Sequence, residues 1–182
     1  MPTIRPSTAQ DIPAITAIYR HHVLHGTGTF EIDPPSESDM AQRRLDVLAK
    51  QLPWLVAVDD AGKVLGYAYA NWFKPRPAYR FSAEDSIYVA EQARGQGVGR
   101  LLLNALCSSC EAIGIRKLIA VIGDSNNLGS IGVHRSAGFQ HAGALTNVGW
   151  KFDRWLDIVM MEKPLGEGGS TPPQCGHETR LS

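Results

Sequence analysis

Apolar residues recur along this chain with two periods, one typical of amphipathic helices and one typical of strands. The segments predicted as helices are one that starts near Ile12 and breaks at Gly26, one that Ser36 caps, and residues 99–112 and 126–137. The segments predicted as strands are residues 3–5, 52–58, 64–72, 86–90, 118–122, 139–145 and 155–162. Because strands and helices alternate, we expect an α/β or α+β fold whose sheet is covered on both faces.

The end of the chain differs in composition from the rest. Residues 1–163 carry the periodic apolar pattern, whereas residues 164–182 are rich in glycine, proline and serine and have almost nothing to bury. A chain of 182 residues has room for one ordinary domain. We therefore expect a single domain over residues 1–163, followed by a disordered C-terminal tail over residues 164–182.

The charge balance and the hydropathy exclude several classes of protein. Lysine and arginine number 18, as do aspartate and glutamate, so the formal net charge is zero and there is no basic footprint for nucleic acid or for an anionic membrane. No stretch approaches the ~20 apolar residues of a membrane span, and the first residues lack a signal-peptide pattern. Three cysteines do not suggest a disulfide framework. We expect a neutral, cytoplasmic, globular protein.

The most informative segment is residues 86–103, SIYVAEQARGQGVGRLLL, where a predicted strand runs through a glycine-rich turn into a helix. Glycines let the backbone turn tightly and approach a ligand, and the first amides of the helix have no partner within it. Such a turn is suited to a pyrophosphate. It lacks the Gly-Lys-Ser/Thr of a P-loop and the glycine spacing of a dinucleotide fingerprint. The alternative is a glycine-rich connection that binds nothing.

The pattern Arg94-x-x-Gly97-x-Gly99 after a strand is similar to the pyrophosphate motif of acyl-CoA-binding N-acetyltransferases of the GNAT superfamily. Residues 123–139, GDSNNLGSIGVHRSAGF, resemble a later segment of that family. Residues 148–163, VGWKFDRWLDIVMMEK, resemble the branch of phosphinothricin and methionine sulfone or sulfoximine acetyltransferases. The resemblance spans roughly residues 3–163, and it implies a mixed, mostly antiparallel sheet of about seven strands flanked by about four helices.

The same resemblance implies acetyl-CoA as co-substrate. Ile87, Tyr88 and Val89 would pair with the pantetheine arm, and backbone amides around Tyr88 and Val89 would polarise the thioester carbonyl. The residues implied to bind the pyrophosphate are Arg94, Gly95, Gln96, Gly97, Val98, Gly99 and Arg100. The residues implied to bind the CoA arm are Asn126 or Asn127 and Ser130, and capping of a helix is the alternative for one of the two asparagines.

Acetyl transfer to an amine needs a base for the amine and an acid for the departing thiolate. In the branch that the chain resembles, a glutamate at the place of Glu84 is assigned the role of base, acting through water. His134 stands where many GNAT enzymes carry tyrosine, and we interpret it as the acid. The alternatives are a solvated loop carboxylate for Glu84 and a surface histidine without a role for His134. Neither a covalent enzyme intermediate nor a metal is needed.

Three segments are candidates for the acceptor pocket. The segment TFEIDPPS supplies Phe30 as an aromatic wall and Glu31 as an ammonium partner. The proline-rich segment FKPRPAYR supplies Arg76, Tyr79 and Arg80, whose cations could bind the carboxylate or phosphinate of an amino-acid-like substrate or could be merely solvated. Lys151, in the signature VGWKFDRW, is expected to line the pocket or a dimer contact.

Two further features are interpreted as having no role in chemistry. Cys107 and Cys110 have Cys-x-x-Cys spacing, but zinc would need two more ligands at suitable positions. His21, His22 and His25 lack an accompanying carboxylate pattern such as His-Glu-x-x-His, and we expect them to be surface histidines.

We therefore expect an N-acetyltransferase that acetylates the amino group of a small amino-acid-like molecule by direct transfer within a ternary complex. By resemblance, phosphinothricin, methionine sulfone and methionine sulfoximine are the candidate acceptors, and a homodimer is the habit of the family. Two alternatives stay open. One is a catalytically silent acyl-CoA-binding regulatory module, and the other is an enzyme with a protein or polyamine acceptor, although a neutral protein offers little attraction for a polycation.

Overall fold

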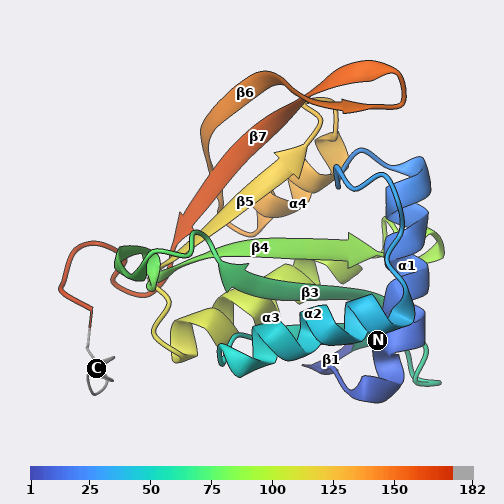
Figure 1. Cartoon of the computed structure of the whole chain (residues 1–182). Helices are drawn as coiled ribbons and strands as arrows, with labels where there is room; N and C mark the ends of the chain where they lie inside the picture. Colours follow the sequence, from blue (N-terminus) through green and yellow to red (C-terminus); the bar gives the residue numbers. More distant parts are fainter. Residues whose placement is uncertain (174–182) are drawn as a thin grey trace.

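The computed structural model describes residues 1–173 of the chain, and a seven-stranded sheet forms the centre of this part (Figure 1). The strands are β1 (Thr3–Pro6), β2 (Trp54–Val58), β3 (Val64–Trp72), β4 (Ser82–Val89), β5 (Lys117–Gly123), β6 (Gln140–Lys151) and β7 (Arg154–Pro164). They lie in the order β1-β2-β3-β4-β5-β7-β6, and only β4 and β5 are parallel neighbours. The predicted mixed, mostly antiparallel sheet is confirmed.

Four α-helices cover the sheet, as predicted. They are α1 (Ile12–His25), α2 (Glu37–Ala49), α3 (Val98–Ala112) and α4 (Leu128–Ser136). Helices α1 and α2 lie in front of the sheet in the view of Figure 1, and α3 and α4 lie behind it. The start of α2 follows from local chemistry, because Ser36 Oγ accepts from the amide of Asp39 and the Asp39 carboxylate accepts from the amide of Ser36.

The central pair of strands separates part of the way along its length. The parallel pairing of β4 and β5 ends where Asp85 faces Ala120, whereas β4 continues to Val89 and β5 to Gly123. Beyond this point the two strands diverge, as Figure 1 shows. The half of the sheet that contains β1–β4 and the half that contains β5–β7 are therefore joined at one end and open at the other.

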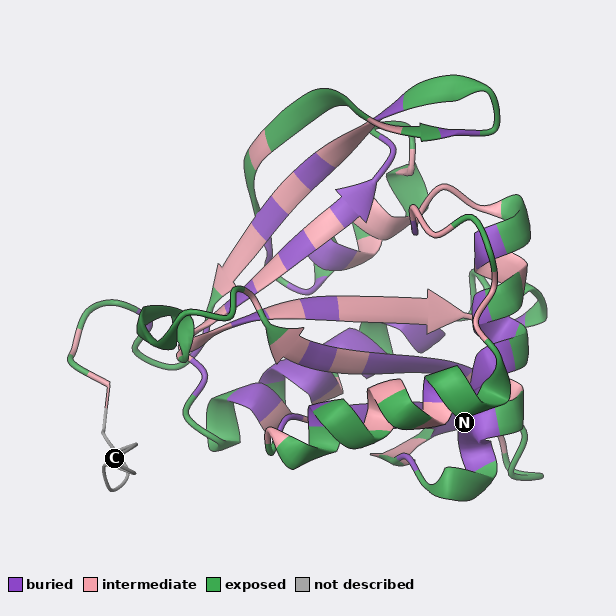
Figure 2. Cartoon of the chain, in the orientation of Figure 1, coloured by how far each residue is buried: buried purple, intermediate pink, exposed green. Residues whose placement is uncertain are grey.

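Strand β5 differs from its prediction as a strand buried on both faces. Leu118, Ala120 and Ile122 are buried, whereas Ile119 and Val121 are only half-buried (Figure 2). The reason is that α4 packs against one face of β5, and within residues 1–173 no helix covers the other face in the same way.

The boundaries of two other strands also differ from prediction. Strand β4 begins at Ser82 rather than at the predicted Ser86, since the prolines of the preceding segment lie before Ser82. Strand β6 continues past residue 145 to Lys151, because register shifts between Leu145 and Gly149 keep it paired with β7.

Packing extends beyond residue 163, where the domain was predicted to end. Strand β7 includes Pro164, and Leu165 is buried, with its amide donating to the Arg116 carbonyl over 3.0 Å. The Arg116 guanidinium in turn donates to the carbonyls of Gly168 (2.9 Å) and Thr171 (3.0 Å). These contacts order a stretch that composition alone marked as tail. The rest of the predicted tail, residues 174–182, lies outside the described residues.

Candidate active site

The open end between β4 and β5 holds a cavity of about 1240 Å³. Ligand pockets are typically about 300–1,000 Å³, so this space can hold a large ligand and a small one together. The predicted site residues that line it are Phe30, Glu84, Ile87, Tyr88, Val89, Arg94, Gly95, Gly97, Val98, Gly99, Arg100, Asn126, Asn127, Ser130 and His134. The predicted residues that do not line it are Glu31, Arg76, Tyr79, Arg80, Gln96 and Lys151.

Residues 94–100, here called the glycine loop, lead from β4 into α3. Gly95 and Gly97 have φ angles of +74° and +79°, a region that favours glycine. Gly97 caps α3, and its carbonyl accepts the first helical bond, from the amide of Leu101 over 3.1 Å. The three amides before Leu101 precede that bond and lie at the positive end of the helix dipole, which is the arrangement that binds phosphate groups.

Two arginines place positive charge beside the glycine loop, and one predicted residue turns away from the cavity. Arg94 and Arg100 are exposed and line the cavity. The Gln96 side chain instead donates to the Gln92 carbonyl over 2.8 Å. Its predicted contribution to binding is therefore limited to its backbone, because the side chain is used to shape the turn.

One edge of β4 is unpaired along the cavity. On its other edge, the amide of Ala90 donates to the Leu65 carbonyl over 2.9 Å. Because backbone groups alternate along a strand, Tyr88 also faces β3, and the peptide groups of Ile87 and Val89 face the cavity. Of the predicted polarising amides around Tyr88 and Val89, that of Val89 therefore faces the cavity, whereas that of Tyr88 faces β3. The Val89 carbonyl oxygen lies 2.9 Å from His22 Nε2, so the Ile87 peptide groups and the Val89 amide are the groups left to pair with an extended ligand as another strand would.

His22 is not the surface histidine that the sequence suggested. Its Nε2 lies 2.9 Å from the Val89 carbonyl oxygen, and its ring contacts the Tyr88 ring edge-on, with 5.2 Å between centroids. Burial lowers the pKa of His22, so the neutral ring with hydrogen on Nε2 is the form that donates to Val89. Its spacing of three residues from Tyr19 on α1 was the signal that it faces inward.

The start of α4 also faces the cavity. Asn127 is the N-cap of α4: its Oδ1 accepts from the amide of Ser130 over 3.2 Å, and its Nδ2 donates to the Gly123 carbonyl over 3.3 Å. Capping, the alternative left open for one asparagine, therefore applies to Asn127. Asn126 is exposed at the cavity, so it is the asparagine whose side chain is available to a ligand.

Glu84 lies within β4 rather than in an irregular loop. It is half-buried and lines the cavity, and none of the side-chain hydrogen bonds between residues 1 and 173 involves its carboxylate. Burial and the neighbouring Asp85 carboxylate raise the pKa of Glu84, and Lys74 partly opposes them. A carboxylate with a raised pKa is a better match to proton transfer near neutrality. This environment differs from that of a solvated loop acid.

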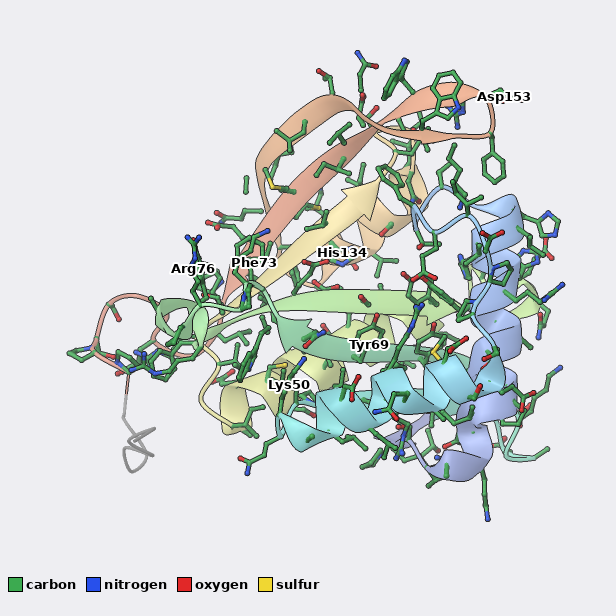
Figure 3. The ribbon with its side chains drawn as sticks, viewed as in Figure 1. Lys50, Tyr69, Phe73, Arg76, His134 and Asp153 are labelled. Carbon is green, nitrogen blue, oxygen red and sulfur yellow. The ribbon has the colours of Figure 1, made fainter. Side chains whose placement is uncertain are left out.

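His134 is buried rather than at the surface, near the point where β4 and β5 part (Figure 3). Its Nε2 lies 2.9 Å from Asp85 Oδ2, and its Nδ1 lies 2.8 Å from the Ser130 carbonyl oxygen. Burial lowers the pKa of His134, but the hydrogen bond and the charge of Asp85 raise it further, so the net direction is upward. Both ring nitrogens already have acceptors, which a sequence-based reading of His134 as a free acid did not foresee.

Phe30 and Glu31 lie in the loop of residues 26–31, between α1 and α2, and only Phe30 reaches the cavity. The Glu31 carboxylate is held by the Arg43 guanidinium of α2 through two contacts of 2.6 and 3.1 Å. Its predicted role as an ammonium partner is therefore at odds with the structure, because a cation of the protein already occupies it. Arg43 was missed, since nothing in the α2 sequence marks it as facing this loop.

Lys151 does not line the cavity as predicted. The residue is 5% exposed, and its ammonium donates to the carbonyls of Gly26 (2.9 Å) and Thr29 (2.8 Å). Burial lowers the pKa of Lys151. The side chain therefore holds the loop of residues 26–31 from behind, which requires a contact between residues more than a hundred positions apart.

The cationic loop before β4 lies apart from the main cavity. Arg76 and Tyr79, with Lys74 and Pro75, line a separate pocket of about 310 Å³. Figure 3 shows Arg76 beside the start of β4, at the end of the sheet away from α1. Arg80 stacks its guanidinium on the Phe81 ring, with 4.5 Å to the centroid. The structure therefore does not bring these predicted substrate residues together with Phe30 and Glu84.

The remaining features belong to the core or offer no ligand set in the described part of the chain. Cys107 and Cys110 are buried on the inner face of α3, and burial raises the pKa of both thiols, that of Cys110 to about 12. Within residues 1–173, no cluster of three or more potential metal ligands occurs. In the same range, no helix is long and apolar enough to cross a membrane.

One class of enzyme combines the features found here. They are a parallel pair of strands that diverge, an unpaired strand edge and a glycine loop at the start of a helix. The model of the acetyltransferase (GNAT) family matches residues 16–139, which is more than half of the chain. The chain belongs to this family, and it is an N-acetyltransferase.

Individual relatives agree with the narrower resemblance to one branch. The chain is 52% identical to a phosphinothricin N-acetyltransferase of Alcaligenes faecalis, over 94% of this chain and 87% of the relative. It is 41% identical to an L-methionine sulfoximine/L-methionine sulfone acetyltransferase of Pseudomonas paraeruginosa, over 93% and 98%. A crystal structure of a phosphinothricin acetyltransferase from Sinorhizobium meliloti in complex with AcCoA has a TM-score of 0.94 and 45% identity, over 99% and 97% of the two chains. The predicted resemblance to this branch is confirmed.

Proposed function

We propose that the protein transfers the acetyl group of acetyl-CoA directly to the amino group of a small amino-acid-like molecule, of the phosphinothricin or methionine sulfoximine type. One observation carries the proposal: a single cavity combines an anion-binding helix start, an unpaired strand edge and a half-buried carboxylate with a raised pKa. The names of the relatives support the substrate class, and the AcCoA complex of the relative from Sinorhizobium meliloti supports the co-substrate.

The residues of the cavity fit acetyl-CoA in charge and in shape. The free amides of the glycine loop, with Arg94 and Arg100, would bind the pyrophosphate, and the Ile87 peptide groups and the Val89 amide would hold the pantetheine arm and the acyl carbonyl. When bound, the thioester supplies an activated acyl group, and no metal is required for its transfer. The amides at the helix start favour the anion without adding to the zero net charge of the chain.

Glu84 is the base in this proposal. Its carboxylate accepts the proton that the acceptor ammonium must lose before the amine attacks, either directly or through one water. Within residues 1–173, the structure offers no equally clear donor for the proton that the leaving thiolate takes up. His134 could donate only by breaking its contact with Asp85 or with the Ser130 carbonyl, so its role as acid stays a prediction.

The test is release of free thiol from acetyl-CoA across a panel that contains phosphinothricin, methionine sulfoximine, methionine sulfone, spermidine and an unstructured peptide. We expect turnover with the first three, and initial-velocity lines that intersect, because direct transfer needs both substrates bound together. Parallel lines would indicate a covalent enzyme intermediate instead. Tight binding of acetyl-CoA without turnover of any acceptor would identify a silent acyl-CoA-binding module, and a preference for spermidine or the peptide would replace the acceptor class.

A homodimer is a second part of the proposal. Apolar side chains that are about half exposed gather on the β6–β7 hairpin, namely Leu145, Val148, Trp150, Phe152 and Trp155. Exposed aromatic groups on one element mark an interaction surface rather than ordinary scatter. Sedimentation equilibrium should give twice the chain mass, and the change Trp155→Glu should shift the protein toward monomer. A monomer at all concentrations would contradict this part alone. A cytoplasmic location stays a prediction from the sequence.

A further inference from the structure

The loop of residues 26–31 is held from both halves of the split sheet. On one side, the Tyr19 hydroxyl of α1 lies 2.9 Å from the Thr29 hydroxyl, and α1 packs on β3 and β4. On the other side, Lys151 at the end of β6 donates to the carbonyls of Gly26 and Thr29. The loop therefore crosses the open end of the sheet, from the end of α1 toward the ends of β5 and α4 (Figure 1).

A second contact with β6 is steric. The Phe30 ring packs directly on Gly149, and a Cβ at Gly149 would overlap the ring. The same ring lies against Gly123 at the end of β5, where a Cβ would also overlap the Thr27 carbonyl. Phe30 thus packs between β5 and β6. Glycine is required at positions 123 and 149 because the ring fills the space that a side chain there would take.

We propose that Lys151 and Gly149 are positioning residues for acetyl transfer: together they hold the loop of residues 26–31, and with it Phe30, at the end of the cavity that receives the acceptor amine. The part that names the amine rests on the proposed function. The part that concerns the placement of the loop rests only on the contacts of Lys151 and Phe30. Neither residue lines the cavity, so their effect on the reaction is exerted through the loop.

The inference follows from what the loop would lose without them. One ammonium satisfies the buried carbonyl of Thr29 and the half-buried carbonyl of Gly26, and removing this charged donor leaves the Thr29 carbonyl unsatisfied away from water. The loop contributes five of its residues to the wall of the cavity, Gly26, Thr27, Gly28, Thr29 and Phe30. The glycine loop lies at the start of α3, and no side-chain hydrogen bond within residues 1–173 joins it to Lys151, so acetyl-CoA binding should be insensitive to the same change.

The chain offers a matched control for each substitution. Gly149→Ala places a methyl group against Phe30, whereas Gly143→Ala on the same strand places it at 3.6 Å from the end of the Met160 side chain, an ordinary contact. Lys151→Met removes the two loop contacts, whereas Lys163→Met removes a similar contact of a half-buried lysine, 2.6 Å from the Ala137 carbonyl, away from the loop. The pairs separate loss of the loop contacts from general damage to the fold.

Two measurements decide the matter. Hydrogen exchange of peptides that cover residues 26–31 should quicken about tenfold in Gly149→Ala and in Lys151→Met but not in the controls, and exchange in α3 should stay unchanged. The acceptor KM should rise about tenfold in the same two variants, with the Kd for acetyl-CoA, measured by calorimetry, within about twofold of wild type.

The possible outcomes separate the two proposals. Unchanged exchange in both variants would overturn the positioning role, and so would a loss of acetyl-CoA affinity as large as the rise in acceptor KM. Quickened exchange with an unchanged acceptor KM would show that the held loop does not position the acceptor, which also overturns the inference. If the wild-type protein acetylates no acceptor, the proposed function fails, and the exchange data still decide whether Lys151 and Gly149 hold the loop.

Discussion

At one end of the cavity, the glycine loop leads into α3 and leaves three backbone amides without a helical partner, whereas at the other end the loop of residues 26–31 is held by contacts with α1, α2, β5 and β6. The first end needs little beyond a strand, two glycines with positive φ and a helix start. The second depends on contacts between positions as distant as Gly26 and Lys151. The glycine loop is therefore formed by local backbone geometry, while the placement of the loop of residues 26–31 requires the assembled fold.

The two ends also differ in how they use charge. Near the glycine loop, Arg94 and Arg100 are exposed and face the cavity, so their cations are available. At the other end, the ammonium of Lys151 and the guanidinium of Arg43 are each taken up by groups of the protein itself. The charges at this end therefore act on the loop of residues 26–31 rather than on a ligand. Four predictions test this contrast, in order of expected size.

The largest effect is expected at Glu84, which faces the space between the two ends. Glu84→Gln removes the base while keeping its size, so kcat/KM at neutral pH should fall about 10²–10⁴-fold. Because the pKa of Glu84 is raised, the wild-type rate should increase as pH rises through that value, and the variant should lack this increase and recover partly at high pH. The pH profile of thiol release checks this. Glu91→Gln, an exposed carboxylate at the cavity rim, should stay within about twofold.

The second prediction concerns the buried pair of His134 and Asp85, which ties α4 to β4. Both elements line the cavity, so this pair tests whether the cavity wall depends on a contact between residues that are distant in the sequence. Asp85→Asn should lower the free energy of unfolding by about 3–5 kcal/mol, since it leaves His134 without its charge partner. The folded-state pKa of His134 is raised, so this stabilisation is fully present below the ordinary value of 6.5 and is lost as pH rises through the raised value.

Urea unfolding of wild type and Asp85→Asn between pH 5.5 and pH 9, a range of about 3.5 units that includes the ordinary histidine pKa, measures this difference. It should be largest at the acid end and shrink as pH rises. Asp60→Asn, whose ion pair with the N-terminus is exposed, should leave the unfolding midpoint unchanged at every pH. A difference that does not vary with pH would show that Asp85 acts without the charge of His134.

The third prediction concerns the backbone of the glycine loop. Gly97→Val should weaken acetyl-CoA binding by tenfold or more, because a β-branched residue at φ +79° is strained by roughly 1–2 kcal/mol and its side chain would stand where the pyrophosphate approaches. Gly62→Val is the matched control: its φ is +82°, and a Cβ there also meets open space, but it lies in the turn between β2 and β3. Calorimetry should show normal affinity for Gly62→Val, and equal losses in both variants would rule out the glycine loop as the binding site.

The smallest effect is expected at Glu31. Because its carboxylate is paired with Arg43 and both side chains are more than a third exposed, Glu31→Gln should cost no more than about 1 kcal/mol of stability. The acceptor KM should change by less than about threefold. A rise of tenfold or more in the acceptor KM, measured by thiol release, would mean that Glu31 leaves Arg43 to bind the ammonium, and would restore its predicted role.

The fold and the backbone of the glycine loop could be predicted because their signals are local. Alternation and helical spacing located the elements, and Gly95 and Gly97 lie in one run between a strand and a helix. Arg76, Tyr79 and Arg80 were misplaced because charge and proline content in a loop do not say which cavity the loop borders. His22 was overlooked, although its spacing from Tyr19 on α1 carried the information.

The sequence by itself determined the local backbone features of the site. These are a strand, a glycine loop and a helix start, with Glu84 near them in the sequence. Only the tertiary structure decided which side chains are free. Glu31 is bound by Arg43, Lys151 by two carbonyls, and His134 by Asp85, and each partner lies on another element. The physical reason is that backbone geometry is encoded over a few neighbouring residues, whereas the state of a charged side chain depends on what the fold packs against it.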